Sequence, residues 1–269
     1  MPRMTTALSE HWPEYLMEAW GLGTFMVSAG LFGVLLFYPG SSVVMALPDP
    51  LIRRILMGLA MGATAVCIIY SPWGQQSGAH LNPAVTLTFL YLGKVAPWDA
   101  FFYIFAQFLG GITGVYSVIT ILGERFAAPP VSFVATMPGA GFKAAFVTEA
   151  VITFILMMTV LIATNTRRLA RFTGFFAGCL VAAFITLVAP ISGMSMNPAR
   201  SFASAFPAGL WNGLWIYFIA PPLGMLTAAT VFRLVRHGRE VVCAKLNHHT
   251  TRRCIFLRCR YGDMMAGKE

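Results

Sequence analysis

Two short helix starts of the same design constrain this chain more than any other feature. In each one, asparagine precedes proline, and these residues favour the N-cap and the first position of a helix respectively. The apolar run that follows ends after about ten residues, so each helix would span roughly 15 Å, which is half the hydrocarbon core of a bilayer. The residues are Asn82, Pro83 and Ala84 in the first copy and Asn197, Pro198 and Ala199 in the second.

The chain around these helix starts is too apolar for an ordinary soluble domain. Hydrophobic residues make up 57% of the 269 positions and charged residues 11%, with a mean hydropathy of +0.70. This composition indicates an integral membrane protein. The two short helices are therefore predicted to be re-entrant segments whose positive N-terminal ends meet inside the membrane.

Six further apolar segments are long enough to cross a bilayer, and they fall into two similar halves. Asn197 follows Asn82 by 115 residues, and a Gly-x-x-x-Gly pair at Gly174 follows its counterpart at Gly58 by 116 residues. Three spans per half would invert the second half relative to the first about an axis in the membrane plane. The expected spans are 15–37, 51–70, 100–122, 142–164, 172–189 and 211–234.

The fold class predicted from this pattern is an all-α membrane protein with six transmembrane helices and two re-entrant half-helices, arranged as an inverted repeat. Repeat one covers residues 15–122 and repeat two covers residues 142–234, within a single domain of residues 1–235. Residues 236–269 form a basic tail that we expect to be partly disordered. Pro190 is expected to end the fifth span, and Pro221-Pro222 to interrupt the sixth.

The net charge of +9 indicates how the chain is oriented in the membrane, because the basic residues lie mostly in loops and in the tail. No nucleic-acid partner is expected. If both termini are cytoplasmic, fourteen Lys and Arg residues lie on that side and four lie on the other. The positive-inside rule then places both termini in the cytoplasm, in the plasma or inner membrane of the cell. Membrane lipids are the expected surroundings.

Inversion would bring Asn82 and Asn197 together near the membrane midplane from opposite sides. Their side-chain amides can donate hydrogen bonds to a passing molecule, and the two helix N-termini create a positive potential there. A neutral molecule that accepts hydrogen bonds is compatible with this site. A cation, including a hydrated proton, is not.

The flanks of the two motifs carry a family resemblance. Ser77-Gly78-Ala79-His80-Leu81 precedes the first Asn-Pro-Ala, and Arg200-Ser201-Phe202 follows the second. The chain resembles the aquaporin (major intrinsic protein) family, as a bacterial-type channel. The resemblance implies an hourglass fold, a homotetramer with one pore in each protomer, no cofactor, and a passive channel rather than an enzyme.

The resemblance also implies which residues form the selectivity filter. Arg200 matches the arginine of the family's outer constriction, where a fixed charge would donate hydrogen bonds to permeants and repel cations. The other corners fall on Met194, Ile185, and Met61 or Gly62, with the last choice left open by one extra residue in 71–76.

Three further positions carry over from the family. Glu18 and Glu149 match buried glutamates that accept hydrogen bonds from the re-entrant loops, and structural support is the role expected of both. His80 matches a loop residue near the cytoplasmic mouth, where we expect it to line the pore or to pack. A pH gate at His80 is the alternative.

The permeant is the open question. Ser201, Ala205 and the pair Tyr217-Phe218 match water channels of the family, whereas Ile185 and Met61 stand where a histidine and an aromatic residue are usual. We therefore expect a water channel that excludes protons and ions. The alternatives are a broader channel for small neutral solutes such as glycerol, urea or ammonia, and a structural or junctional membrane protein with little flux.

The tail contains several potential metal ligands. They are Cys243, His248, His249, Cys254 and Cys259. Their spacing fits no common structural zinc finger, so no metal is expected, and a basic segment near anionic lipid is the favoured interpretation.

Overall fold

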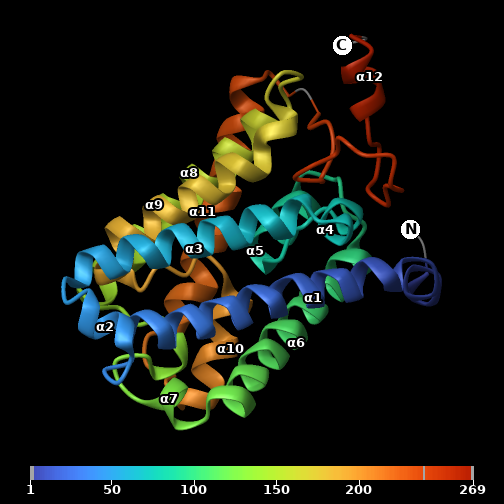
Figure 1. The fold of residues 1–269 in the computed structure, drawn as a ribbon. Helices are drawn as coiled ribbons and strands as arrows, with labels where there is room; N and C mark the ends of the chain where they lie inside the picture. Colours follow the sequence, from blue (N-terminus) through green and yellow to red (C-terminus); the bar gives the residue numbers. More distant parts are fainter. Residues whose placement is uncertain (1–2, 239, 268–269) are drawn as a thin grey trace.

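The computed structural model describes residues 3–238 and 240–267, and every regular element in those ranges is helical. Six helices are long and apolar enough to cross a membrane (Figure 1). They are α1 (Met4–Phe37), α3 (Pro50–Tyr70), α6 (Pro97–Leu122), α8 (Phe142–Thr164), α9 (Thr173–Ser192) and α11 (Leu214–Val235). The predicted fold class is confirmed.

The half-helices are α5 (Pro83–Tyr91) and α10 (Pro198–Ala208), and they lie between the long helices (Figure 1). In the first half α1 packs on α6, and in the second half α8 packs on α11 in the same way. Helices α3 and α9 pack on each other and join the halves, while α5 and α10 both contact α6 and α11. This pairing is what a two-fold inverted repeat requires.

Glycines allow the close approaches in this arrangement, and they occur at matching positions. A Cβ at Gly110 of α6 would clash with the carbonyl oxygen of Ala19 in α1, and a Cβ at Gly224 of α11 would clash with that of Ala150 in α8. Between α3 and α9, Gly62 has the same relation to the carbonyl oxygen of Gly178. Small residues let membrane helices pack backbone to backbone, and here they bring α1 against α6, α8 against α11 and α3 against α9.

Pro190 does not end the fifth span, contrary to the expectation from the sequence. Helix α9 continues through it to Ser192 and ends at Gly193, which has a φ of +77°. A proline inside a helix leaves the carbonyl four residues earlier without its partner. Here that carbonyl belongs to Thr186, and the Nε of Arg54 on α3 donates to it at 2.9 Å. Pro221 and Pro222 likewise lie within the continuous helix α11.

The first span is longer than expected because the helix continues back into the polar N-terminal segment. Helix α1 begins at Met4, and Asp99 at the start of α6 fastens this extension. The hydroxyl of Tyr15 donates to Asp99 at 2.7 Å and lies 3.0 Å from the carbonyl oxygen of Ala7, while His11 Nδ1 lies 2.8 Å from the Asp99 carboxylate.

The remaining elements are short. They are α2 (Ser42–Ala46), α4 (Pro72–Ser77), α7 (Glu124–Ala127), η1 (Ser132–Val134), η2 (Ala170–Phe172) and α12 (Tyr261–Met265). The tail runs from the end of α11 to α12, at the end of the bundle where the N-terminal part of α1 also lies (Figure 1). Residues 240–260 contain no helix or strand, yet many of them are buried. This defined path differs from the partly disordered tail that composition alone indicates.

Candidate functional site

Asn82 and Asn197 meet at the N-termini of the two half-helices. The Oδ1 of Asn82 accepts from the N–H of Ala84 at 2.8 Å, and its Nδ2 donates to the carbonyl oxygen of Met196 at 2.7 Å. In the other half, the Nδ2 of Asn197 donates to the carbonyl oxygen of Leu81 at 2.7 Å. Each amide therefore caps its own helix and binds the opposite loop. A primary amide has two N–H donors, so one on each asparagine is left for a permeant.

A buried glutamate holds the first re-entrant loop. Glu18 of α1 accepts hydrogen bonds from the backbone N–H groups of His80 at 3.0 Å and Leu81 at 2.6 Å. The Ser77 hydroxyl and the Gln107 amide donate to the same carboxylate at 2.7 and 2.8 Å. Four donors around one fully buried carboxylate compensate for its desolvation and fix the loop.

Glu149 of α8 holds the second loop in the same way. Its carboxylate accepts from the backbone N–H groups of Ser195 at 2.9 Å and Met196 at 2.7 Å, and from the Ser192 hydroxyl at 2.7 Å. The two loops also share an unusual backbone: Ala79 and Leu81 in the first and Met194 and Met196 in the second have φ values of +49° to +57°. Such conformations persist where the surroundings determine them, and the glutamate bonds do so here.

On one side of the asparagines lies a cavity of about 410 Å³, the filter-side cavity. Arg200, Met194, Ile185 and Met61 all contribute to its wall. Met61 and Met194 are buried and apolar, so Arg200 is the one charged member of this set. The buried Nη1 of Arg200 has no hydrogen-bond partner among the described residues, which leaves a donor for a molecule in the cavity.

The two candidates for the fourth filter position differ in where the structure places them. Met61 lines the filter-side cavity, whereas Gly62 packs against Gly178 of α9 and does not line it. A side chain at position 62 would clash with the Gly178 carbonyl. Gly62 therefore has a packing role between α3 and α9, and of the two candidates Met61 is the one in the cavity wall.

Sequence reasoning missed the wall that α1 contributes. Phe25, Ala29, Gly33 and Phe37 line the filter-side cavity, and they share one helix face because each follows the previous one by four residues. That spacing is visible in the sequence. It was missed because an apolar face on a membrane helix is equally compatible with packing or lipid contact.

Beyond the filter lies a smaller cavity of about 110 Å³, the mid-pore cavity, which has room for several water molecules. Asn82 and Asn197 line it, and Arg200 borders both cavities. His80 and Leu246 form part of its far wall. The two cavities follow each other from the filter, past the asparagines, to His80, as the two halves of a pore would.

His80 connects the pore to the tail. Its Nε2 lies 3.0 Å from the carbonyl oxygen of Ala244, and since a carbonyl can only accept, the ring donates there. The ring stacks between Phe89 of α5 and Phe256 of the tail, with centroids at 5.2 and 5.3 Å. His80 is thus a buried contact between the first re-entrant loop and the tail.

Residues 240–260 cross this end of the pore, which we call the tail-side mouth. The N–H of Leu246 donates to the carbonyl of Gly78 at 3.1 Å, and the Leu246 side chain enters the wall of the mid-pore cavity. The N–H of Val242 donates to Asn165 Oδ1 at 2.7 Å, and Arg253 Nε donates to the buried Glu14 of α1 at 2.7 Å.

Further contacts fasten the tail beside α5. The N–H of Leu257 donates to the Lys94 carbonyl at 2.8 Å, and the Lys94 ammonium donates to the Arg258 carbonyl at 3.0 Å. Lys94 also lies 3.4 Å from Glu240, and its charge lowers the pKa of that carboxyl. The tail is therefore attached on several sides of the mouth and covers it.

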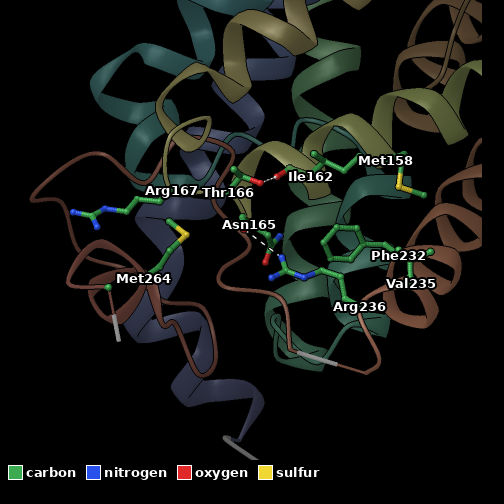
Figure 2. Close-up of a pocket in the computed structure, with 10 residues that line it drawn as sticks. Met158, Ile162, Asn165, Thr166, Arg167, Phe232, Val235, Arg236 and Met264 are labelled. Atoms are coloured by element: carbon green, nitrogen blue, oxygen red, sulfur yellow. Dashed lines mark hydrogen bonds between the residues drawn. The ribbon is translucent and has the colours of Figure 1, made fainter. Parts of the chain in front are cut away.

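A larger cavity, of about 600 Å³, lies apart from the pore between the ends of α8 and α11 and helix α12 (Figure 2). Asn165 and Arg236 meet in its wall, where Arg236 Nη1 donates to the Asn165 carbonyl at 3.2 Å. None of its lining residues contributes to the filter-side or mid-pore cavity. Its size alone does not make it part of the permeation path.

A multi-pass helical bundle, in which two capped half-helices meet between two cavities, defines the class as a membrane channel. Residues 10–232 match the model of the family described as "Major intrinsic protein". The chain belongs to this family, and it is a channel and not an enzyme. The match ends before the tail.

Individual relatives agree with this assignment. Putative aquaporin NIP4-1 of Arabidopsis thaliana is 32% identical over 224 residues, which is 82% of this chain and 71% of the relative. Aquaporin NIP1-1 of Zea mays is 29% identical over 88% of this chain and 76% of the relative. The solved structure of the aquaglyceroporin from Plasmodium falciparum aligns with a TM-score of 0.66, covering 84% of this chain and 97% of that one. Its sequence identity is 22%, so it supports the fold alone.

Proposed function

We propose that this protein is a passive channel for water and small neutral solutes such as glycerol, which excludes protons and other ions. The observation that carries the proposal is the composition of the filter. Arg200 is joined there by Met61, Ile185 and Met194, none of which is charged or an amide, while Arg54, the other charged residue of the cavity wall, donates through its Nε to the Thr186 carbonyl. Thioether and alkyl side chains can contact the carbon atoms of a polyol while Arg200 donates to its hydroxyl oxygens.

Ion exclusion follows from the centre of the pore. The N-termini of α5 and α10 meet there, and their dipoles place positive potential where Asn82 and Asn197 offer only N–H donors to the passage. Arg200 adds a full positive charge between the two cavities. A cation entering the pore loses hydration and gains no compensating oxygen ligands from these groups.

The sequence favours water alone as the permeant, because Ser201, Ala205 and the pair Tyr217-Phe218 match water channels. These residues are not among those that line the filter-side cavity. Residues in the wall bear on selectivity directly, and we give them more weight than matches elsewhere in the chain.

Orientation and assembly are further parts of the proposal. The excess of Lys and Arg on the tail side favours a cytoplasmic location of both termini in the cell membrane. The relation to the aquaporins favours a homotetramer with one pore in each protomer. Cross-linking of the purified channel followed by mass measurement tests the oligomeric state.

Stopped-flow light scattering on proteoliposomes tests the permeant. Under a sucrose gradient we expect shrinkage at least several times faster than in empty vesicles, and under a glycerol gradient we expect accelerated reswelling. Because the tail, which contains several potential metal ligands, covers one mouth, the comparison includes vesicles prepared in the presence of a metal chelator. Fast water flow with no glycerol flux would restore the water-only alternative.

The same vesicles address the two other classes of function. A secondary transporter would show saturable uptake coupled to an ion gradient, and such coupling usually needs acidic side chains at the midplane. The buried carboxylates of Glu18 and Glu149 are instead occupied by loop N–H groups. A scaffold without a working pore would show no flux above that of empty vesicles in any state of the tail.

A further inference from the structure

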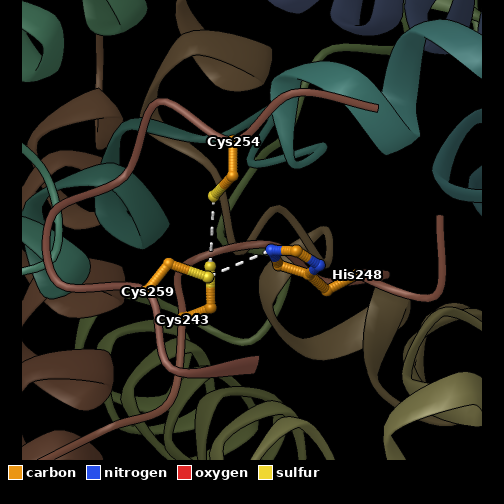
Figure 3. A group of neighbouring side chains, drawn as sticks. All are labelled: Cys243, His248, Cys254 and Cys259. Carbon is orange, nitrogen blue, oxygen red and sulfur yellow. Dashed lines mark hydrogen bonds between the residues drawn. The ribbon is translucent and has the colours of Figure 1, made fainter. Parts of the chain in front are cut away.

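The tail brings four potential metal ligands together. Cys243, His248, Cys254 and Cys259, which we call the tail cluster, each offer one ligand atom, and these atoms all lie within 4.8 Å of one another. Figure 3 shows the three thiols and the imidazole pointing toward a common centre. The Sγ atoms of Cys243 and Cys254 are 3.5 Å apart, and Cys259 Sγ is 3.1 Å from His248 Nε2.

These distances suit a tetrahedral metal ion. With Zn–S bonds of about 2.3 Å, the ligand atoms of a tetrahedral zinc site are roughly 3.8 Å apart. The distances in the tail cluster lie on both sides of that value, so shifts of about 1 Å or less would complete the site. Three cysteines and one histidine form one of the common structural zinc sites, and soft sulfur ligands favour zinc over magnesium or calcium.

The buried but irregular backbone of the tail is consistent with stabilisation by a bound metal ion. Residues 240–260 form no helix or strand, yet Val241, Cys243, Ala244 and Lys245 are each at most 2% exposed. Segments of this length without secondary structure are uncommon inside compact domains. A metal bound by the ordered form alone would stabilise it, since the free energy of binding then contributes to folding.

Lys245 adds an electrostatic argument. Its buried ammonium donates to the carbonyl oxygens of Arg252 and Arg253, the two residues that precede Cys254, and no carboxylate of the described residues pairs with it. Three thiolates and one Zn²⁺ carry a net charge of −1. A lysine fastened next to one of the ligands offsets that charge.

The histidine is positioned by stacking. The ring of His248 lies on Tyr261, the first residue of α12, with centroids 4.4 Å apart and planes at 14°. Its Nδ1 has no hydrogen-bond partner among the described residues, so the stack, and not a hydrogen bond to Nδ1, sets the orientation of the ring. This leaves Nε2 facing Cys259.

We propose that the tail cluster binds one Zn²⁺ ion and that the bound zinc holds the tail across the tail-side mouth, so that the channel is closed. Ala244 and Leu246, which contact His80 and the mid-pore cavity, lie between the ligands Cys243 and His248. Phe256, which stacks on His80, lies between the other two ligands. The segments that touch the pore are thus loops closed by the metal.

The proposal differs from the expectation that the tail binds no metal. Successive ligands are separated by five, six and five positions, and this spacing matches no common finger. The spacing could not reveal the site because the backbone between the ligands is fixed by contacts with the channel. Binding involves no redox step: Zn²⁺ replaces the protons of the three thiols, and a chelator that removes the ion allows the thiols to take protons again.

Metal content of the purified full-length channel tests the site. After incubation with Zn²⁺ and removal of excess metal, we expect one zinc per chain by plasma mass spectrometry and close to none in the double variant Cys254→Ser/Cys259→Ser. The matched control is Cys67→Ser/Cys179→Ser, because those two cysteines are exposed on α3 and α9, and it should keep the wild-type zinc content.

Two results would overturn the site. One is a wild-type channel that binds no more zinc than the Cys254→Ser/Cys259→Ser variant. The other is a Cys243–Cys254 disulfide, seen by non-reducing mass spectrometry as the loss of two hydrogens, that forms in place of zinc binding. A tetrahedral thiolate absorption spectrum after Co²⁺ is substituted for Zn²⁺ would support the assigned ligands.

Protease cleavage of the tail and osmotic permeability test whether bound zinc closes the channel. This part of the proposal rests on the proposed channel function. Trypsin cleavage after the buried Lys245 should be at least about tenfold faster once a chelator removes zinc, and osmotic permeability should rise several-fold. The Cys254→Ser/Cys259→Ser variant should resemble the stripped wild type with or without Zn²⁺. Unchanged cleavage and permeability in a channel shown to bind zinc would overturn the closure.

If no vesicle conducts in any state, the proposed function fails, while zinc content and trypsin protection still decide the metal site and its hold on the tail.

Discussion

The two re-entrant loops are nearly the same inside the pore and differ at its two ends. Each ends in an asparagine that caps a half-helix and donates to the other loop, and each is held by a buried glutamate. Each also has left-handed residues three and one positions before the asparagine. The repeated part of the sequence therefore builds the centre of the pore.

At the ends the two halves differ in residue type: Arg200 stands where the first half has Val85, and His80 stands where the second half has Ser195. The second loop continues into Arg200 beside a cavity of about 410 Å³. The first loop carries His80, which is covered by the tail. We infer that the repeat supplies the part of ion exclusion that acts at the midplane, to which the charge of Arg200 adds, and that the residues that differ between the halves decide which solutes are admitted and when.

The largest effect should come from removing either glutamate. Glu18→Ala or Glu149→Ala leaves at least two buried N–H groups without acceptors, at a cost of about 1–3 kcal/mol for each group. Both variants should lower the unfolding midpoint of the detergent-solubilised channel by on the order of 10 °C. Tryptophan fluorescence during heating measures it.

Glu124→Ala is the matched control, because this glutamate is exposed in the short helix α7. Its midpoint should stay within about 1 °C of the wild-type value. If Glu18→Ala and Glu149→Ala differed greatly from each other, the two loops would not be equivalent in the way described above.

Charge substitution at the asparagines should have the next largest effect. A carboxylate at position 82 or 197 would attract cations to the centre of the pore, and we expect a proton or sodium leak about tenfold above wild type, equivalent to about 1.4 kcal/mol. The leak should be larger for Asn82→Asp than for Asn197→Asp, since Asn197 caps the turn that contains Arg200. Ion-sensitive dyes inside vesicles measure the leak.

Asn212→Asp is the control for this pair, because Asn212 is exposed in the loop between α10 and α11 and lies outside the two pore cavities. It should leak no more than wild type. Equal leaks from Asn82→Asp and Asn197→Asp would show that Arg200 does not act on the midplane.

Much of the pore centre could be predicted from sequence because it depends on local signals. Asparagine and proline define the first turns of α5 and α10, and α8 has the expected bounds of Phe142 and Thr164. The course of α9 through Pro190 depends on Arg54, which is 132 residues from Thr186. No local pattern could supply that partner.

The burial of the tail could not be predicted from the sequence for the same physical reason. Its composition is basic, which favours a solvated segment, but its burial depends on contacts with Gly78, Asn165 and Glu14 in three different parts of the chain. The metal ligands come together only once those contacts are made. Sequence reasoning succeeds here where the stabilising partner is within a few residues.

A smaller effect is expected at the tail-side mouth. Leu246→Ala removes the side chain that enters the mid-pore wall but leaves the tail backbone in place. Water permeability should rise about threefold, which corresponds to a barrier lower by about 0.7 kcal/mol. Leu257→Ala is the control, since this leucine is exposed in the same tail and should leave permeability unchanged. A rise of equal size in both variants would indicate loosening of the tail as a whole.

The smallest effect should come from the filter, where Ile185→His adds a second polar group opposite the apolar methionines. An imidazole that donates or accepts there would favour water over a polyol whose carbon atoms need apolar contacts, so the ratio of glycerol to water permeability should fall about twofold, or about 0.4 kcal/mol. Ile185→Val keeps the site apolar and should preserve the ratio. Stopped-flow measurements on the same vesicles give both rates. If Ile185→His left the ratio unchanged, residues elsewhere along the pore would decide which solute is admitted. The filter end would then not determine selectivity, contrary to the contrast drawn between the centre of the pore and its ends.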